Sequence, residues 1–316
     1  MNSKNNLKSK INNIYETALL LCNNSNLEDT KKIKLMKYLI NRYNHKIKEI
    51  NEPYNKFLTN DVTAKKSNNK SALLIGINYY GSNYELNGCI NDVNSIKNFL
   101  INKDFNNIVL LTDDNLNIQT STKSNIIDGL IKILINSQSG DTIVLMYSGH
   151  GSYCLDENND ELRGYDQTII SCDLKRIKDD ELKSIIGKYL KKDVTLFCLF
   201  DSCYSGSVLD LKYQYLDSLN ENKLTVNDKE KETRGNVIMI SGCNDEQTSS
   251  DSYIDNNYSG AMTAAFLYCC NNIPQKYLTW KKILLGMRKY LKKNGYAQIP
   301  QLSSDKLIDI NSTLCF

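Results

Sequence analysis

Apolar and polar positions alternate in blocks along the chain from residue 71 onward. Short, nearly continuous apolar runs that end in turn residues predict buried strands, and they read SALLIGIN, NIVLLTDD, DTIVLMYS, VTLFCLF and NVIMISG. Between them, apolar residues recur at intervals of three and four, which predicts helices, as in GCINDVNSIKNFL, STKSNIIDGLIKILINSQ and DDELKSIIGKYL. Strands that alternate with helices, each strand apolar nearly throughout, indicate an α/β fold with a mostly parallel sheet covered by helices on both faces.

Two regions depart from this rhythm. Residues 1–70 are rich in Lys and Asn, and the spacing of their apolar residues predicts one helix with the stripe Ile33, Met36, Ile40, Tyr43, Ile47 and Ile50. Residues 207–235 are polar and charged, which predicts an exposed linker. We therefore expect a helical N-terminal extension, 1–70, followed by one domain, 71–316, that the linker divides into parts of 71–206 and 236–316.

Composition and charge exclude several classes of protein. The 39 Lys and Arg residues nearly balance the 36 Asp and Glu residues, and the net charge of +3 argues against a nucleic-acid or membrane-surface partner. No apolar run reaches the ~20 residues that span a bilayer, and the first residues lack the pattern of a secretory signal. None of the ten cysteines forms a C-x-x-C pair. We expect a cytoplasmic monomer whose cysteines are reduced.

The chemistry depends on few candidates, because the chain contains only two histidines. His45 lies off the apolar stripe of its helix, as a solvated surface residue would. His150 lies between glycines just after a predicted strand, and Cys203 follows another predicted strand in a second glycine-bounded loop. A cysteine nucleophile needs a base, and one imidazole can serve. Taken singly, His150 could be a structural histidine and Cys203 a buried thiol, but their matched positions favour a catalytic pair.

The sequence then resembles a known family. The motifs ALLIGINYY, LNGCINDV, YSGHGS, GYDQTIISCD, DDEL, DSCYSGSVLDL, MISGCNDEQTSSD, GAMTAAF and PQLSS occur in the order of the metacaspases, Cys/His peptidases of the caspase-like fold. The resemblance covers about residues 71–316 and is closest to the type I group. The spacing of His150 and Cys203 is near the ~50 residues of caspase-type enzymes. The resemblance implies His150 as base, Cys203 as nucleophile and an oxyanion hole formed by the N–H groups of Gly151 and Cys203.

The same resemblance implies cleavage of peptides and proteins after Arg or Lys. The residues that match the family's basic-side-chain pocket are Cys89, Asp92, Ser148 and Asp201. Elementary electrostatics agrees, since two carboxylates in a partly desolvated pocket favour a cation and Asp can bind a guanidinium through two hydrogen bonds. A pocket for aspartate would need Arg, which the motif loops lack. As an alternative, Asp92 could be a first-turn acid that stabilises its helix.

The resemblance also implies calcium stimulation. The residues that match the calcium site of type I metacaspases are Asp166, Asp179, Asp180 and Asp210. Calcium takes 6–8 oxygen ligands, which four carboxylates, main-chain carbonyls and waters can supply. Asp179 and Asp180 could instead be the N-cap and first-turn acid of the following helix, and the two roles are compatible.

Self-cleavage is a further expectation. Exposed loops are where proteolytic nicking concentrates, and the linker carries the basic residues Lys212, Lys223, Lys229, Lys231 and Arg234. One departure from the family pattern is Tyr204, which follows Cys203 where a His is common. A non-catalytic adaptor of the same fold is the main alternative function. A nucleotide-binding domain ranks below it, because the first strand is not followed by a G-x-G-x-x-G motif.

Overall fold

The structure is a computed structural model that describes most of the chain after residue 66. The described ranges are 67–114, 120–155, 165–202, 208–215, 224–227, 232–242, 251–254 and 257–314, with Glu16, Thr17 and Leu20; the side chains of residues 155 and 251–258 are not described. The chain divides into two compact units, Met1–Ala64 and Lys65–Phe316. The helix expected at residues 33–50 lies outside the described residues.

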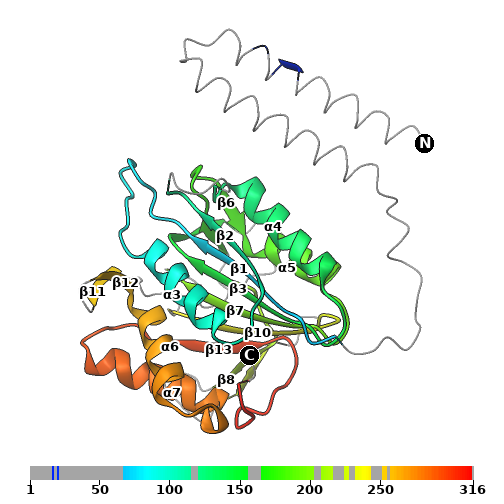
Figure 1. Cartoon of the computed structure of the whole chain (residues 1–316), viewed down its shortest axis with the longest axis vertical. Helices are drawn as coiled ribbons and strands as arrows, with labels where there is room; N and C mark the ends of the chain where they lie inside the picture. The colour runs from blue at the N-terminus through cyan, green and yellow to red at the C-terminus, as the bar shows by residue number, and fades with distance from the viewer. Residues whose placement is uncertain are drawn as a thin grey trace. The chain divides into compact units, whose positions relative to one another are not determined.

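The second unit is built on an eight-stranded sheet in the order β2-β1-β3-β7-β10-β13-β8-β9 (Figure 1). The strands are β1 (Lys70–Gly76), β2 (Asn107–Thr112), β3 (Thr142–Ser148), β7 (Thr195–Asp201), β8 (Tyr213–Tyr215), β9 (Leu224–Val226), β10 (Asn236–Ser241) and β13 (Gln301–Ser304). The five strands from β2 to β10 are parallel, whereas β13, β8 and β9 pair antiparallel. The expected α/β fold with a mostly parallel central sheet is confirmed.

Helices cover both faces of this sheet (Figure 1). They are α3 (Cys89–Ile101), α6 (Ala261–Asn272) and α7 (Trp280–Lys293) on one face, and α4 (Lys123–Asn136) and α5 (Asp179–Tyr189) on the other. Alternate strand residues serve the two faces, because side chains on a strand point to opposite sides. On β1, Leu74 belongs to the core under α3, α6 and α7, and Leu73 belongs to the core under α4 and α5. Within the described residues, no helix combines the length and apolar character needed to cross a membrane.

Two small sheets lie beside the main one. The first consists of β4 (Gly151–Leu155), β5 (Tyr165–Ile170) and β6 (Arg176–Lys178), in antiparallel pairs. The second is the hairpin of β11 (Asp251–Ile254) and β12 (Asn257–Gly260), which leads directly into α6. The first sheet follows β3 in the chain and the hairpin follows β10, so both extend from the carboxyl ends of central strands, where α/β proteins bind ligands.

The expected linker, 207–235, is wrong in part. Its described residues include β8 and β9, which extend the main sheet beyond β13. Val208, Leu209 and Tyr215 are buried, and the hydroxyl of Tyr215 lies 3.0 Å from Oγ of Ser304 on β13. The polar composition hid these strands because each is only three residues long. β8 gains burial from the distant β13, and the exposed β9 pairs with β8.

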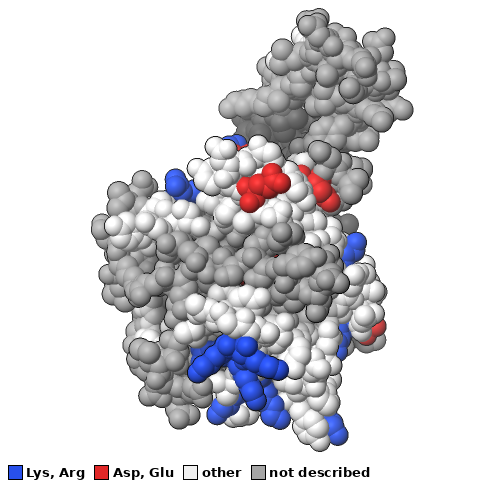
Figure 2. All heavy atoms as spheres, turned by 90° about the vertical axis from the view of Figure 1, so that its left-hand side faces the viewer, with Lys and Arg blue, Asp and Glu red and all other residues white. Residues whose placement is uncertain are grey.

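The balanced net charge conceals an uneven distribution. Between residues 260 and 304 the sequence contains Lys and Arg but no Asp or Glu. Lys282, Lys289, Lys292 and Lys293 are all exposed on α7. In Figure 2, Lys and Arg gather in the lower part of the face that is drawn, and Asp and Glu in its upper part. The net charge of +3 therefore does not describe the individual surfaces of the molecule.

Candidate active site

The two strands that precede His150 and Cys203 are neighbours in the sheet. β3 and β7 run parallel, and Ser148 at the end of β3 lies opposite Asp201 at the end of β7. His150 follows Ser148 by two residues, and Cys203 follows Asp201 by two residues. Cys203 and Tyr204 lie outside the described residues. The structure therefore describes the predicted base and the strand end that leads to the predicted nucleophile.

Two buried tyrosines hold the main chain of His150 from both sides. Its N–H donates to Oη of Tyr79 over 2.9 Å, and Oη of Tyr147 donates to its carbonyl oxygen over 2.7 Å. The two hydroxyls are 3.0 Å apart, and a Cβ added at Gly149 would come within 2.9 Å of both. Burial raises the pKa of both phenols, so they remain neutral at physiological pH. Glycine at position 149 is thus needed for the close approach of these hydroxyls.

The imidazole ring of His150 is oriented by a main-chain carbonyl. Its Nε2 lies 2.7 Å from the carbonyl oxygen of Tyr84, and its ring centroid is 4.7 Å from that of Tyr79. Because a carbonyl oxygen can only accept a hydrogen bond, the proton of the neutral ring is assigned to Nε2. Nδ1 then carries the lone pair and is the nitrogen that can accept a proton.

Asp92 lies at the centre of a second group of predicted residues, in the first turn of α3. Its side chain is fully buried. Its Oδ2 accepts from Oγ of Ser148 over 2.8 Å, and its Oδ1 accepts from Oγ of Ser259 over 2.6 Å. The main-chain N–H of Gly260 donates to both oxygens, over 2.9 and 3.1 Å. These partners come from β3 and β12, so the fold surrounds the carboxylate with neutral donors.

Asp201 reaches the same point from β7. Its Oδ2 accepts from the main-chain N–H of Thr263 over 2.9 Å and from Oγ1 of Thr263 over 2.8 Å. A Cβ added at Gly260 would collide with Oδ2 of Asp201 and lie 2.8 Å from Oδ2 of Asp92, so both carboxylates abut this glycine. Burial, and then the charge of Asp201, raise the pKa of Asp92 to about 7. Two neighbouring carboxylates of this kind attract a cation.

Cys89, the fourth predicted pocket residue, is buried at the first position of α3. The preceding Gly88 has no side chain to cap the helix. Asn78 takes that role, because its Oδ1 accepts from the N–H groups of Cys89 over 3.0 Å and Ile90 over 3.3 Å. This cap fixes the start of the helix whose first turn carries Asp92.

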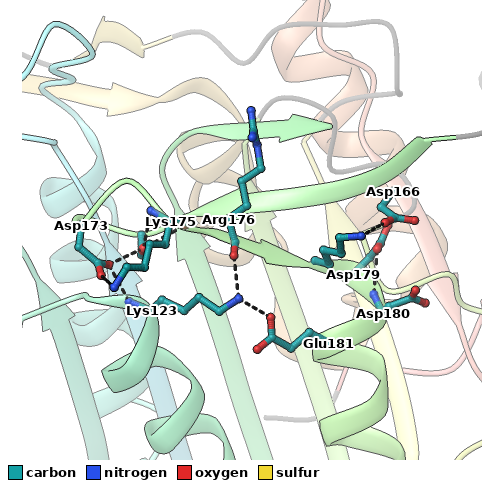
Figure 3. Close-up of polar contacts among 10 residues, drawn as sticks. Lys123, Asp166, Asp173, Lys175, Arg176, Asp179, Asp180 and Glu181 are labelled. Carbon is teal, nitrogen blue, oxygen red and sulfur yellow. Dashed lines mark hydrogen bonds and ion pairs between the residues drawn. The ribbon is translucent and has the colours of Figure 1, made fainter. Parts of the chain in front are cut away.

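Three of the four predicted metal ligands lie together. Carboxylate oxygens of Asp166 on β5 and of Asp179 and Asp180 at the start of α5 are all within 4.8 Å of one another. Figure 3 shows Asp166 facing these two residues across the end of the small sheet. The N–H of Gln167 donates to Oδ2 of Asp179 over 2.5 Å. Among the described residues this acidic group comprises Asp166, Asp179 and Asp180, and Asp210 does not belong to it.

Comparisons with known proteins identify the family of the chain. The family described as the metacaspase peptidase C14 domain matches residues 70–212. Metacaspase-1 of Meyerozyma guilliermondii is 34% identical over 87% of this chain and 79% of its own length. Metacaspase-2 of Trypanosoma brucei brucei is 35% identical over 77% of this chain and 75% of its own length.

The chain belongs to the metacaspase family. It is accordingly a cysteine-type endopeptidase that acts on peptides or proteins. The fold has a further match in the crystal structure of a protein from Geobacter sulfurreducens, with a TM-score of 0.58 and 22% identity over 77% of this chain and 97% of that one. That likeness concerns the fold alone. The predicted membership of the metacaspases is thus confirmed.

The acidic group of this metacaspase fits a hard cation. Asp166 is 2% exposed, and within the described part of the chain its buried Oδ1 has no hydrogen-bond partner. A buried carboxylate oxygen without a partner is costly unless another group or an ion satisfies it. Asp179 and Asp180 offer further oxygen atoms nearby, and oxygen ligands favour calcium over zinc.

Several residues that shape this site were not found by sequence reasoning. They are Asn78, Tyr79, Tyr84, Lys178, Ser259, Gly260 and Thr263. Some lie inside motifs that were recognised, such as ALLIGINYY and GAMTAAF, but a motif does not state which atom contacts which. Ser259 is 167 residues from Asp92, so no local pattern links the two.

Proposed function

We propose that this metacaspase cleaves after Arg or Lys, with Cys203 as nucleophile, His150 as base and calcium as activator. The observation that carries the specificity is the meeting of Asp92 and Asp201 at Gly260. Both carboxylates are buried, and the donors around Asp92 are neutral. A guanidinium or ammonium that enters between them would neutralise charge and form charge-assisted hydrogen bonds.

The proposed reaction uses the His150 geometry directly. Nδ1 of His150 takes the thiol proton, the Cys203 thiolate attacks the scissile carbonyl, and the N–H groups of Gly151 and Cys203 stabilise the oxyanion. The imidazolium then gives its proton to the leaving amine as the C–N bond breaks. Water attacks the acyl-enzyme while His150 accepts a proton from it, the C–S bond breaks, and the imidazolium returns the proton to the Cys203 thiolate. Tyr79, Tyr147 and the carbonyl of Tyr84 keep the ring in place during both steps.

Calcium would be held by Asp166, Asp179 and Asp180, with Asp210 as a further predicted ligand. When bound, the cation neutralises the carboxylates and ties β5 to the start of α5. Since β4 begins at Gly151 and pairs with β5, such a tie bears on the loop that carries His150. The acidic group thus supports calcium stimulation through a contiguous part of the fold.

The experiment that tests this function measures turnover of four reporter peptides that differ only at the residue before the cleaved bond: Arg, Lys, citrulline and Asp. Citrulline has the shape of Arg without its charge. We expect Arg and Lys reporters to be cleaved with calcium, citrulline weakly and Asp hardly at all. Cys203→Ala provides the blank, and a chelator tests the cation. A preference for Asp or citrulline would refute the pocket assignment, and full turnover in chelator would refute calcium stimulation.

We further infer self-cleavage between β9 and β10. In that segment Arg234 is exposed, whereas Lys212, before β8, is mostly covered and lies 3.7 Å from Glu232. Lys223, Lys229 and Lys231 lie outside the described residues. We expect calcium to produce two fragments from the wild type and none from Cys203→Ala, as intact mass would record. Equal cleavage of both proteins would point to a contaminating protease and refute self-cleavage.

A further inference from the structure

Lys178 brings a positive charge into the acidic group that the proposed function assigns to calcium. Its Nζ lies 2.7 Å from Oδ2 of Asp166, whose side chain is 2% exposed, while the lysine side chain is 34% exposed. The other oxygen of the same carboxylate, Oδ1, is buried and has no hydrogen-bond partner among the described residues. Asp166 therefore has its charge balanced at one oxygen and its hydrogen bonding incomplete at the other.

The position of this lysine is fixed by the fold. Lys178 is the last residue of β6, where it lies opposite Thr168 of β5, and Asp179 begins α5 immediately after it. The amine is thus attached one residue away from a predicted ligand. A tethered group competes at a high effective concentration, because it cannot diffuse away.

A divalent cation and this ammonium have opposing effects on each other. Asp166, Asp179 and Asp180 together carry three negative charges when ionised, and Lys178 offsets one of them. A calcium ion bound to Oδ1 of Asp166 would stand a few ångströms from the ammonium at Oδ2, and like charges at that distance in a partly buried site repel strongly. Since the lysine side chain is one-third exposed, it can turn outward into solvent while its main chain stays in β6.

We propose that Lys178 is an internal competitor that sets the calcium affinity of this metacaspase. In the metal-free chain its ammonium is the partner of Asp166, and calcium binds as that ion pair opens. The apparent association constant for calcium is then the intrinsic constant multiplied by the fraction of molecules in which Lys178 has moved away from Asp166. The inference rests on the proposed calcium site and adds the residue that determines its working range.

The test compares calcium affinities of the full chain, measured by titration calorimetry and by the rise of the melting temperature with calcium concentration. Lys178→Met removes the charge and keeps much of the side-chain length. We expect it to bind calcium about tenfold more tightly or better than the wild type. In chelator it should melt at a lower temperature, since Asp166 has lost its charge partner.

Two further variants separate charge from shape. Lys175→Met removes a neighbouring lysine that pairs with Asp173 over 2.9 Å outside the acidic group, and it should leave the affinity unchanged. Lys178→Gln keeps a hydrogen-bond donor without the charge, and it should also bind calcium more tightly than the wild type. It serves as the test variant if Lys178→Met does not fold.

The outcomes distinguish failure of the competitor role of Lys178 from failure of the calcium site. If the wild type binds calcium and both Lys178 variants bind it with equal or lower affinity, the competitor role is refuted while the calcium site stands. If neither the wild type nor the Lys178 variants bind calcium at millimolar concentration, the calcium part of the proposed function fails, and this inference fails with it. Equal tightening in Lys175→Met would show a general effect of surface charge and would also refute the role of Lys178.

Discussion

Asp92 and Asp166 are both buried carboxylates in predicted sites, but their surroundings differ. The partners of Asp92 are two serine hydroxyls and a main-chain N–H, all neutral. The charge partner of Asp166 is the ammonium group of Lys178, and Oδ1 of Asp166 has no hydrogen-bond partner in the ranges that the structure describes. The first carboxylate therefore has complete hydrogen bonding and an uncompensated charge, whereas the second has a compensated charge and incomplete hydrogen bonding.

These surroundings bear on what each site can bind. A carboxylate that is held by neutral donors, when ionised, has no cationic partner to displace before it attracts an organic cation. A carboxylate already paired with lysine must exchange one cation for another. Under the proposed function, the Asp92 site would take a substrate side chain that exchanges quickly, and the Asp166 site an ion whose concentration decides its occupancy.

The largest effect should come from filling the space between Asp92 and Asp201. Gly260→Ala adds a Cβ that would collide with Oδ2 of Asp201 and lie 2.8 Å from Oδ2 of Asp92. We expect kcat/KM for the Arg reporter to fall about a hundredfold or more. The control is Gly187→Ala on α5, where an added Cβ meets no atom within 4 Å. A fully active Gly260→Ala enzyme would contradict the meeting of the two carboxylates at this glycine.

Removing the charge while keeping the shape should have the next largest effect. Asp92→Asn is expected to lower kcat/KM for the Arg reporter by some tens of times and to change that for the citrulline reporter little. The matched control is Asp141→Asn, another buried carboxylate, which accepts from the N–H groups of Asn69 and Gln138. That variant should cost stability but leave the Arg-to-citrulline ratio unchanged. An equal loss for both reporters with Asp92→Asn would argue for a structural role.

At the other acidic group, Asp180→Ala should remove the calcium response. We expect that calcium no longer raises either turnover or the melting temperature, since a ligand has been lost from a site that needs several. Asp173→Ala is the control, because Asp173 pairs with Lys175 outside the group. A calcium-dependent rise in melting temperature that persists in Asp180→Ala would exclude this residue as a ligand.

The smallest effect concerns pH. The pKa of Asp92 is raised from 3.8 to about 7, so in the free enzyme its charge is lost as the pH falls below about 7. The Arg-to-citrulline ratio of kcat/KM should therefore rise by a few times as the pH increases through 7, and Asp92→Asn should abolish that rise. Between pH 3.8 and about 7 the folded state binds more protons at Asp92 than the unfolded state, so stability falls as the pH rises through this window. A ratio independent of pH would contradict the raised pKa.

Much of the fold could be predicted because its signals are local. The five parallel strands are apolar runs flanked by turn residues. Thr122, of a residue type favoured at helix N-caps, caps α4 by accepting from the N–H of Asn125. β8 and β9 were missed because three residues such as YQY carry no usable periodicity. The partner of β8 in the sheet, β13, lies about 90 residues further along the chain, and within the described sheet β9 pairs only with β8.

The residues of the candidate site also differ in whether a local sequence signal reveals them. His150, Asp92 and Asp201 were found because each lies in a recognisable motif at the end of a strand or the start of a helix. Lys178 was not found, because a lysine before an acidic helix start is unremarkable in sequence and becomes informative only beside Asp166. The cytoplasmic location and monomeric state expected from composition remain predictions.

The order of the strands also determines how a cut chain would hold together. β10 and β13 come from the C-terminal part of the chain, yet they lie between β7 on one side and β8 and β9 on the other. A cut between β9 and β10 leaves two polypeptides whose strands alternate within one sheet. Separating them breaks two strand pairings, β7–β10 and β8–β13. After a cut before β8, only the β7–β10 pairing joins the two fragments within the sheet. The position of a single cut thus decides whether the two fragments are joined by two strand pairings or by one.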